Sequence, residues 1–452
     1  MIATTVVAVC LASLAGAHAD APSGDETVVV ASASVVDLDG PELEHVLELR
    51  RAWGLSTDGG TVGDLYRHPV EAGALEATDD RYGGLRLRAD EVEIAAEHAR
   101  NEWLAPSVRS AAVAILGSAI HGGTFVEGLS IVVQCAGCEV ETVRTEIVDR
   151  VPDAESALDV RVVTYPLVEL VEIHHEVATM LESDLSAVTS RIDEPTNRVI
   201  VAVLAEDVVL AQSAVSSFPT SSVSIEVLPG EPQDYVDKDD YYLFGVVGGG
   251  MSLDTSTQVG KCTSGVPTNN AAYGDMLLTA GHCGSTTSPS WLQGGSSLGV
   301  FALDSDSGNF DVGGIAIGGT RPSAGNIHST STDYWHTLTF AIGMNGDVTG
   351  STVCQNGLAT TGMSGNSNPT NRCGTLTSLT FDPGAGWNPV FRYATMYGNT
   401  NDSGATIYWP TIYGYGAVGV LKGGSNPGGS PVWYSHLPYA LNAWGLTLKP
   451  FT

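Results

Sequence analysis

The stretch Leu277-Leu278-Thr279-Ala280-Gly281-His282-Cys283-Gly284 decides the interpretation of the fold, because an apolar run ends there in a turn of small residues that presents a histidine. The apolar run predicts a buried strand, and the small residues predict the turn that ends it. A histidine held at the rim of a rigid core can act as a general base, and a bridge from Cys283 to Cys262 would fix the turn. An isolated histidine in such a loop is more often a surface residue, so His282 needs further support.

That support comes from a second turn, Gly398-Asn399-Thr400-Asn401-Asp402-Ser403-Gly404-Ala405-Thr406. A serine hydroxyl becomes nucleophilic beside a base, and acyl transfer needs backbone N–H donors that converge on the developing oxyanion. A turn rich in glycine and asparagine can supply both. Asp-Ser-Gly alone is also a common surface turn, and the strand-like run 415–421 that follows favours the functional interpretation.

The composition changes near residue 245. Residues 246–452 are rich in Gly, Ser, Thr and Asn, with short β-prone runs, and they hold six basic and nine acidic residues, a net charge of −3. The preceding residues 1–245 carry −28 of the total of −31. The short, regularly spaced runs predict an all-β sandwich or barrel over 246–452, with one closing helix near 437–444.

The acidic half reads as an α+β region after an export signal. Apolar spacing predicts a helix around 90–100, and β-rich runs predict strands at 129–133 and 198–204. Residues 1–19 end in Ala17-His18-Ala19, a small-x-small cleavage pattern, so we expect a secreted, extracellular protein without a membrane anchor. The strong acidity argues against nucleic-acid binding.

Six cysteines remain if Cys10 is removed with the signal, and an even number in an exported chain favours disulfides. They are close neighbours in the sequence as Cys135/Cys138, Cys262/Cys283 and Cys354/Cys373, although sequence alone does not fix their pairing. Zinc binding is disfavoured because the spacing is unsuitable and histidine partners are missing. For Cys135 and Cys138 a local bridge is the simplest interpretation, since a redox site lacks the expected helix context.

These segments together resemble the secreted bacterial serine proteases of the chymotrypsin clan, in the streptogrisin and α-lytic protease group. The family's base segment is matched by Thr279–Cys283, its nucleophile segment by 401–405, and its final Tyr-Gly-Leu-x-Leu element by 444–448. The resemblance implies a catalytic domain of two six-stranded β-barrels over 246–452. It assigns His282 as general base and Ser403 as nucleophile.

The third catalytic residue is expected between these two, at the start of a strand where a buried carboxylate can accept the imidazole N–H. Asp304, Asp306 and Asp311 are the candidates. The segment 309–317 resembles the family's, and the apolar strand after Asp311 would bury it. Asp304 and Asp306 stand among Ser and Gly and are interpreted as loop residues, so Asp311 is the predicted member.

Further expectations follow from the resemblance. It implies disulfides Cys262–Cys283 and Cys354–Cys373, and an oxyanion hole formed by Asn401 and Ser403. It also implies a substrate pocket with Leu421, Gly423 and Gly424, which favours an apolar or aromatic side chain before the cut. The implied enzyme is a monomer that cleaves proteins or peptides without a cofactor or metal.

The acidic half resembles the family's prosegment, so residues 20–245 are expected to assist folding and to inhibit the protease until release near 242–249. A two-barrel protein has mostly non-local pairings and folds slowly, which a templating partner can accelerate.

Three departures from the family pattern bear on activity. Asn401 replaces a glycine, Lys422 replaces a serine, and no cysteine flanks Ser403. The Lys422 cation could compete with His282 for Asp311 or lower the pKa of that carboxyl, or it could point to solvent. A catalytically impaired homologue that only binds peptides, or a serine esterase, therefore stays as an alternative.

Overall fold

The computed structural model describes residues 38, 40–69, 72–75, 82–182, 188–228, 233–234, 247–255, 258–288, 290–293, 296–307, 310–318, 323–328, 335–357, 372–383, 391–411, 414–425 and 430–449. The expected signal peptide at 1–19 and the expected domain boundary at residue 245 lie outside the described residues. The first part of the expected release segment, 242–246, lies outside them too.

The acidic half alternates helices with short strands, as the mixed periodicity predicts. Its elements are α1 (Gly40–Ala52), α2 (Gly59–Arg67), β1 (Ala74–Leu75), β2 (Leu87–Arg88), η2 (Ala89–Glu91), α3 (Val92–Leu116), β3 (His121–Glu127), β4 (Ser130–Ala136), α4 (Val140–Arg150), η3 (Pro152–Ala154), β5 (Leu158–Val163), α5 (Leu167–Glu182), β6 (Val188–Asp193), β7 (Arg198–Val203), η4 (Ala205–Asp207), α6 (Val208–Ala214), η5 (Val215–Ser217), β8 (Val223–Val227) and β9 (Gln233–Asp234).

Two small layered units make up most of this half. Strands β3, β4 and β5 form a sheet covered by α3 and α4, and a cluster that includes Ile131, Val133 and Ile147 fills the space between them. Strands β6, β7 and β8 are covered by α5 and α6 around Leu170 and Val201. In each unit the helices bury the apolar face of a sheet.

The second half is built almost entirely of strands. They are β10 (Val247–Gly249), β11 (Ser252–Thr255), β12 (Gln258–Thr263), β13 (Pro267–Asn270), β14 (Gly274–Thr279), β15 (Trp291–Gln293), β16 (Ser296–Ser307), β17 (Phe310–Ile317), β18 (Ser323–His328), β19 (Trp335–Ala341), β20 (Thr352–Gln355), β21 (Cys373–Asp382), β22 (Phe391–Ala394), β23 (Thr406–Thr411), β24 (Gly414–Gly424), β25 (Val432–His436) and β26 (Leu446–Leu448). Among its described residues the helical elements are η6 (Gly281–Cys283) and α7 (Leu437–Trp444), and α7 is the predicted closing helix.

These strands form two sheets. One has eight strands in the order β12-β11-β15-β16-β17-β14-β13-β26. In the other, pairings run around a circuit of six strands, β20-β21-β22-β25-β24-β23 and back to β20, with β19 paired to β24 and β18 paired to β19. The prediction of a strand-rich second half is confirmed. The expected six strands per barrel are not what the first sheet shows, because it has eight and its order is an open path among the described residues.

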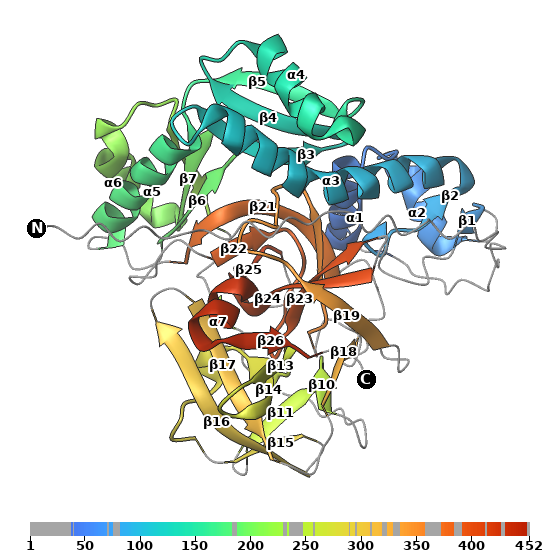
Figure 1. The fold of residues 1–452 in the computed structure, drawn as a ribbon, viewed down its shortest axis with the longest axis vertical. Coiled ribbons are helices and arrows are strands. Elements are labelled where there is room, and N and C mark those ends of the chain that lie inside the picture. The colour runs from blue at the N-terminus through green and yellow to red at the C-terminus, as the bar shows by residue number, and fades with distance from the viewer. Residues whose placement is uncertain are drawn as a thin grey trace, which may run out of the picture.

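The two halves share one sheet. Strand β6 of the acidic half pairs antiparallel with β21, through Phe381 opposite Arg191, and β9 pairs antiparallel with β24. Figure 1 shows the result: the orange and red strands of the second half lie between the blue and green units and the yellow strands of the eight-stranded sheet. None of the described helices combines the length and the apolar character needed to cross a membrane.

Candidate active site

His282 lies where strand β14 ends. Met276, Leu277 and Leu278 are buried in β14, and the chain then turns through η6, which carries His282. Gly281 is required in this turn, because a Cβ at its position would lie 2.1 Å from the Ser305 carbonyl oxygen. The close approach brings the η6 backbone against β16 and β17, so the histidine is held by packed strands rather than by a free loop.

Asp311 is the second residue of β17, and its side chain is fully buried. Its Oδ2 lies 2.6 Å from His282 Nδ1, and its Oδ1 accepts the His282 backbone N–H at 2.8 Å. Ser435 of β25 binds the Asp311 backbone on both sides, accepting from N at 2.8 Å and donating to O at 3.0 Å. Sequence reasoning missed Ser435, a neutral residue in an apolar strand that no motif marks.

The two rejected aspartates lie in β16 and not in a loop, which corrects the sequence interpretation. Asp304 and Asp306 are exposed, and Asp306 stands opposite Asp311 in the β16–β17 register. The strand continues through them because β16 pairs with β17 along its whole C-terminal part. No contact to an imidazole nitrogen is found for Asp304, whereas Asp311 is bonded to His282 twice.

The ionised state of Asp311 is strongly favoured. Burial alone would raise the pKa of this carboxyl, but the charge of His282, its hydrogen bonds and the Lys422 ammonium together lower the pKa to about 2. Asp311 is therefore a carboxylate at any pH at which the imidazole can be neutral, and it can hold Nδ1–H of His282 as an acceptor.

Ser403 lies in the turn before β23, with its Oγ 3.0 Å from His282 Nε2. The same Oγ lies 2.9 Å from the Lys422 carbonyl oxygen, its second potential acceptor. The turn is held by Asp402, whose side chain accepts the Asn399 N–H at 2.8 Å and whose carbonyl accepts the Ala405 N–H at 2.8 Å. His282 therefore contacts both predicted partners, one through each ring nitrogen.

The backbone of the turn around Ser403 is left-handed at two positions. Asn401 has φ +87° and Gly404 has φ +93°, both in the left-handed region, where asparagine is among the tolerated non-glycine residues. The N–H groups of Asp402 and Gly404 are bonded to the carbonyls of Asn399 and Leu421. For the Ser403 N–H, no acceptor is found among the described residues. Such a group can donate to an incoming oxygen.

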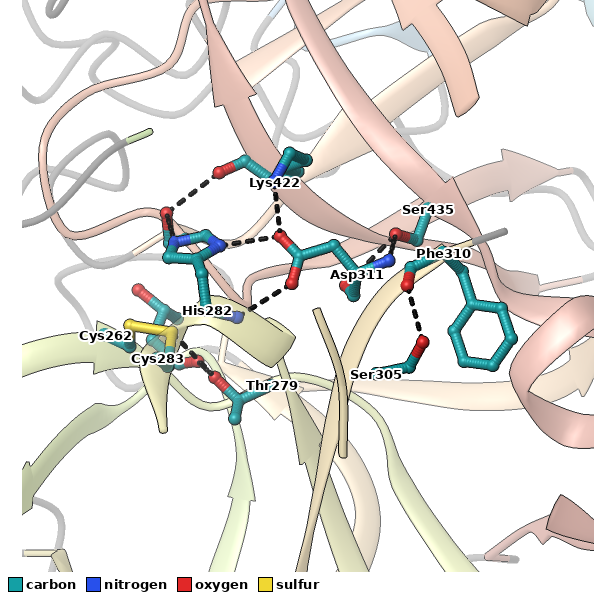
Figure 2. A network of polar contacts seen from close by, with 11 residues as sticks. Cys262, Thr279, His282, Cys283, Ser305, Phe310, Asp311, Lys422 and Ser435 are labelled. Carbon is teal, nitrogen blue, oxygen red and sulfur yellow. Dashed lines mark hydrogen bonds and ion pairs between the residues drawn. A yellow bond between two sulfur atoms is a disulfide. The ribbon is translucent and has the colours of Figure 1, made fainter. Parts of the chain in front are cut away.

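Lys422 does not point to solvent. It is 5% exposed in β24, and its Nζ lies 3.1 Å from Asp311 Oδ2, the same oxygen that contacts His282 Nδ1. Figure 2 shows Lys422 and His282 meeting at this carboxylate, with Ser435 at the Asp311 backbone on the side away from His282. Of the alternatives raised by the sequence, the structure has the one in which the cation binds Asp311.

The predicted pocket residues Leu421, Gly423 and Gly424 lie in β24 on either side of Lys422, and all three are buried. Strand β9 pairs there, with Asp234 opposite Gly423 and Gln233 opposite Gly424. The segment of β24 next to Ser403 thus already holds an extended peptide of the acidic half.

Three cysteine pairs lie at disulfide distance: Cys262–Cys283, Cys354–Cys373 and Cys135–Cys138. The first joins β12 to η6 directly behind His282, and the second joins β20 to β21. For the third, helix context does exist, because α4 begins at Val140 just after Cys138. This corrects the expectation that the pair lacks a helix.

Two groups of side chains among the described residues are close enough to hold a cation. The group of Cys262, His282 and Cys283 offers no thiolate, because its cysteines are bonded to each other. The group of His282, Asp306 and Asp311 consists of the hydrogen-bonded pair and an exposed carboxylate.

Comparisons with known proteins give structural neighbours only. No family model and no curated protein matches the chain. Among solved structures, a Nocardiopsis protease is 23% identical, with a TM-score of 0.36, over 45% of this chain and 99% of its own. Thermobifida fusca protease A is 22% identical, with a TM-score of 0.35, over 45% and 99%. Cellulomonas bogoriensis chymotrypsin is 23% identical, with a TM-score of 0.34, over 45% and 98%. The neighbours are proteases, and function is argued below from the geometry of this site.

Proposed function

We propose that residues 246–452 form a serine endopeptidase that cleaves peptide bonds through an acyl-enzyme. The observation that carries the proposal is the position of the His282 ring. Its Nδ1 lies 2.6 Å from Asp311 Oδ2, and its Nε2 lies 3.0 Å from Ser403 Oγ. Nδ1–H can donate to the Asp311 carboxylate, which leaves Nε2 as an acceptor for the Ser403 hydroxyl proton.

The reaction follows from these contacts. Ser403 Oγ attacks the carbonyl carbon of the peptide while His282 Nε2 takes its proton, and Asp311 stabilises the imidazolium that forms. The backbone N–H groups of Asn401 and Ser403 stabilise the oxyanion. His282 then gives the proton to the leaving amine, and a water molecule, activated by His282, releases the acyl group.

The substrate is expected to be a protein or peptide with an apolar or aromatic residue before the cut. Leu421, Gly423 and Gly424 support this, since none of them brings a charge to the wall of the pocket. An extended substrate would add to β24 by backbone hydrogen bonds, as β9 does.

We further propose that residues 20–245 are a prosegment that assists folding and inhibits the enzyme, following a signal peptide at 1–19 that directs the protein out of the cell. Two pairings support inhibition: β9 occupies β24 beside the pocket residues, and β6 extends the protease sheet at β21. The mature enzyme is proposed to be an extracellular monomer.

A peptide-binding module without activity is the second candidate, and the strand β9 bound on β24 is the observation that favours it. A fluorophosphonate reagent separates the two. With an active enzyme, Ser403 is labelled covalently and the label maps to its peptide, whereas a folded Ser403→Ala variant stays unlabelled. Absence of label on the folded, processed wild type would reject the endopeptidase. Parallel assays with peptide amides and with esters distinguish a peptidase from an esterase.

A further inference from the structure

Lys422 touches two members of the proposed triad at once. Its Nζ binds Asp311 Oδ2 at 3.1 Å, and its carbonyl oxygen lies 2.9 Å from Ser403 Oγ. The ammonium is buried, with 6% of its side chain exposed, and its carboxylate partner is fully buried. An ion pair excluded from water keeps its electrostatic effect on its neighbours, because bulk solvent and salt screen it little.

Few other charged side chains lie in the described elements around Lys422 and Asp311. The described elements packed on β17 are β14, β16, β24, β25, η6 and α7. Their other charged or titratable groups are the triad itself, Asp275 in β14, Asp304 and Asp306 in β16, His436 in β25 and several tyrosines. Asp275 is bound by Lys449, and burial followed by the charge of Arg392 lowers the pKa of His436 to about 3, so that His436 is neutral above that pH.

Lys422 is thus the fixed positive charge among these elements, and it shares an acceptor atom with His282. When the imidazole is protonated, two cations, His282 and Lys422, contact the same Oδ2 atom of the Asp311 carboxylate. The positive charge of Lys422 therefore disfavours protonation of the His282 imidazole. Asp304 and Asp306 act in the opposite sense, and a carboxylate oxygen of Asp306 lies within 4.8 Å of a His282 nitrogen; both side chains are exposed, so solvent weakens their effect relative to that of buried Lys422.

We propose that Lys422 is a positioning residue that extends the activity of the protease to acidic pH by opposing protonation of His282. The inference rests on the proposed function. Its direction follows from the role of the base: only neutral imidazole can accept the Ser403 proton, so a charge that resists protonation keeps the enzyme active as the pH falls. Removing that charge moves the acid limb of the rate profile to higher pH.

The test uses the full-length chain, left to process itself, with three variants. Lys422→Ser introduces the residue of the resembled family and Lys422→Met removes the charge while keeping the bulk. Lys422→Arg keeps the charge and serves as the rescue. The readouts are kcat/KM for a peptide amide and the rate of fluorophosphonate labelling, each measured from about pH 4 to 9, with circular dichroism as the check on folding.

The expected result is an acid limb that rises by about one pH unit in Lys422→Ser and Lys422→Met, with the Lys422→Arg limb at the wild-type position. At a pH below the wild-type midpoint the neutral variants then lose about ten-fold more in kcat/KM, relative to wild type, than they lose at the optimum. A merely structural role would lower the rate at every pH and leave the limb in place.

Coincident limbs in wild type and a folded neutral variant overturn the inference and leave the endopeptidase intact. A wild type that is neither labelled nor active rejects the proposed function itself. If neither neutral variant folds, the wild-type profile decides, because an acid-limb midpoint above about 6.5, the ordinary histidine value, shows that the charge of Asp311 outweighs that of Lys422 and overturns the extension of activity to acidic pH.

Discussion

Residues 1–245 carry a net charge of −28 and place several ion pairs at the surface, such as Arg161 with Glu127 and Arg191 with Glu226. Residues 246–452 carry −3, yet the ion pairs Asp347–Arg392 and Asp311–Lys422 are buried. Exposed pairs contribute little to stability, whereas a buried charge is tolerated only with a partner. Both halves hold buried pairs, since Arg50–Glu91 of the acidic half is buried too, but in the second half one of them lies at the proposed catalytic site.

The largest expected effect comes from removing the hydroxyl of the proposed nucleophile alone. Ser403→Ala is expected to lower kcat by at least about 1,000-fold, because the hydroxyl that forms the acyl-enzyme is lost. Peptide hydrolysis measured on the full chain provides the readout. The control is Ser216→Ala, an exposed residue of the acidic half, which is expected to behave as wild type. Equal activity of Ser403→Ala and wild type would contradict the assignment of Ser403.

The next test separates the halves physically. Residues 246–452 refolded alone are expected to regain activity at least about ten-fold more slowly than with residues 20–245 added, because their strand pairings are largely non-local. Activity after dilution from denaturant is the measurement. Prompt refolding of 246–452 to full activity without the acidic half would contradict its role as a folding assistant.

Matched arginines compare buried and exposed charge directly. Arg392 donates to Asp347 and contacts His436 at 3.1 Å in the interior, so Arg392→Met strands a buried carboxylate and is expected to cost about 3–5 kcal/mol of unfolding free energy. Arg161→Met, in an exposed cluster of the acidic half, is expected to cost roughly 0–1 kcal/mol. Denaturant unfolding of both variants in a Ser403→Ala background avoids self-digestion. Equal losses of unfolding free energy in the two variants would contradict the distinction between buried and exposed ion pairs.

The last prediction concerns the dependence of stability on pH. Burial alone would raise the pKa of Asp347, but Arg392 and its other neighbours lower it from 3.8 to about 2. A lowered pKa in the folded state stabilises the protein above the ordinary value, and this stabilisation is lost as the pH falls from about 4 toward 2. It amounts to roughly 2 kcal/mol, so Asp347→Asn is expected to flatten the loss of stability over that interval. An unchanged slope in acid unfolding would refute this assignment.

The sequence predicted the parts of the site that lie in local motifs. His282, Ser403 and the strand start at Asp311 each have neighbours that specify a turn or an apolar strand, and α7 begins and ends at the predicted residues. Their catalytic roles stay predictions until the labelling experiment is done. Local sequence therefore predicted which residues stand in turns and at strand ends.

The orientation of Lys422 could not be read in this way. In a regular strand, neighbours point to opposite faces, so burial of Leu421 would place Lys422 outside. Residues 416–424 of β24 are all buried, so both faces of this part of the strand are covered and Lys422 is enclosed together with Leu421. The pairing of β6 with β21 could not be predicted from the sequence either. It joins residues about 190 positions apart, such as Arg191 and Phe381, and depends on the assembled sheet.

The junction of β6 with β21 has a consequence for the proposed maturation. If the acidic half is released as proposed, the end of β21 around Phe381 and Asp382 becomes an open sheet edge whose backbone groups have lost their present partner strand. An aspartate at that margin disfavours the addition of another chain, since charged side chains are a common guard against self-association. Under the proposed maturation, the enzyme exchanges a covalently tethered strand for a sheet edge that ends in an aspartate.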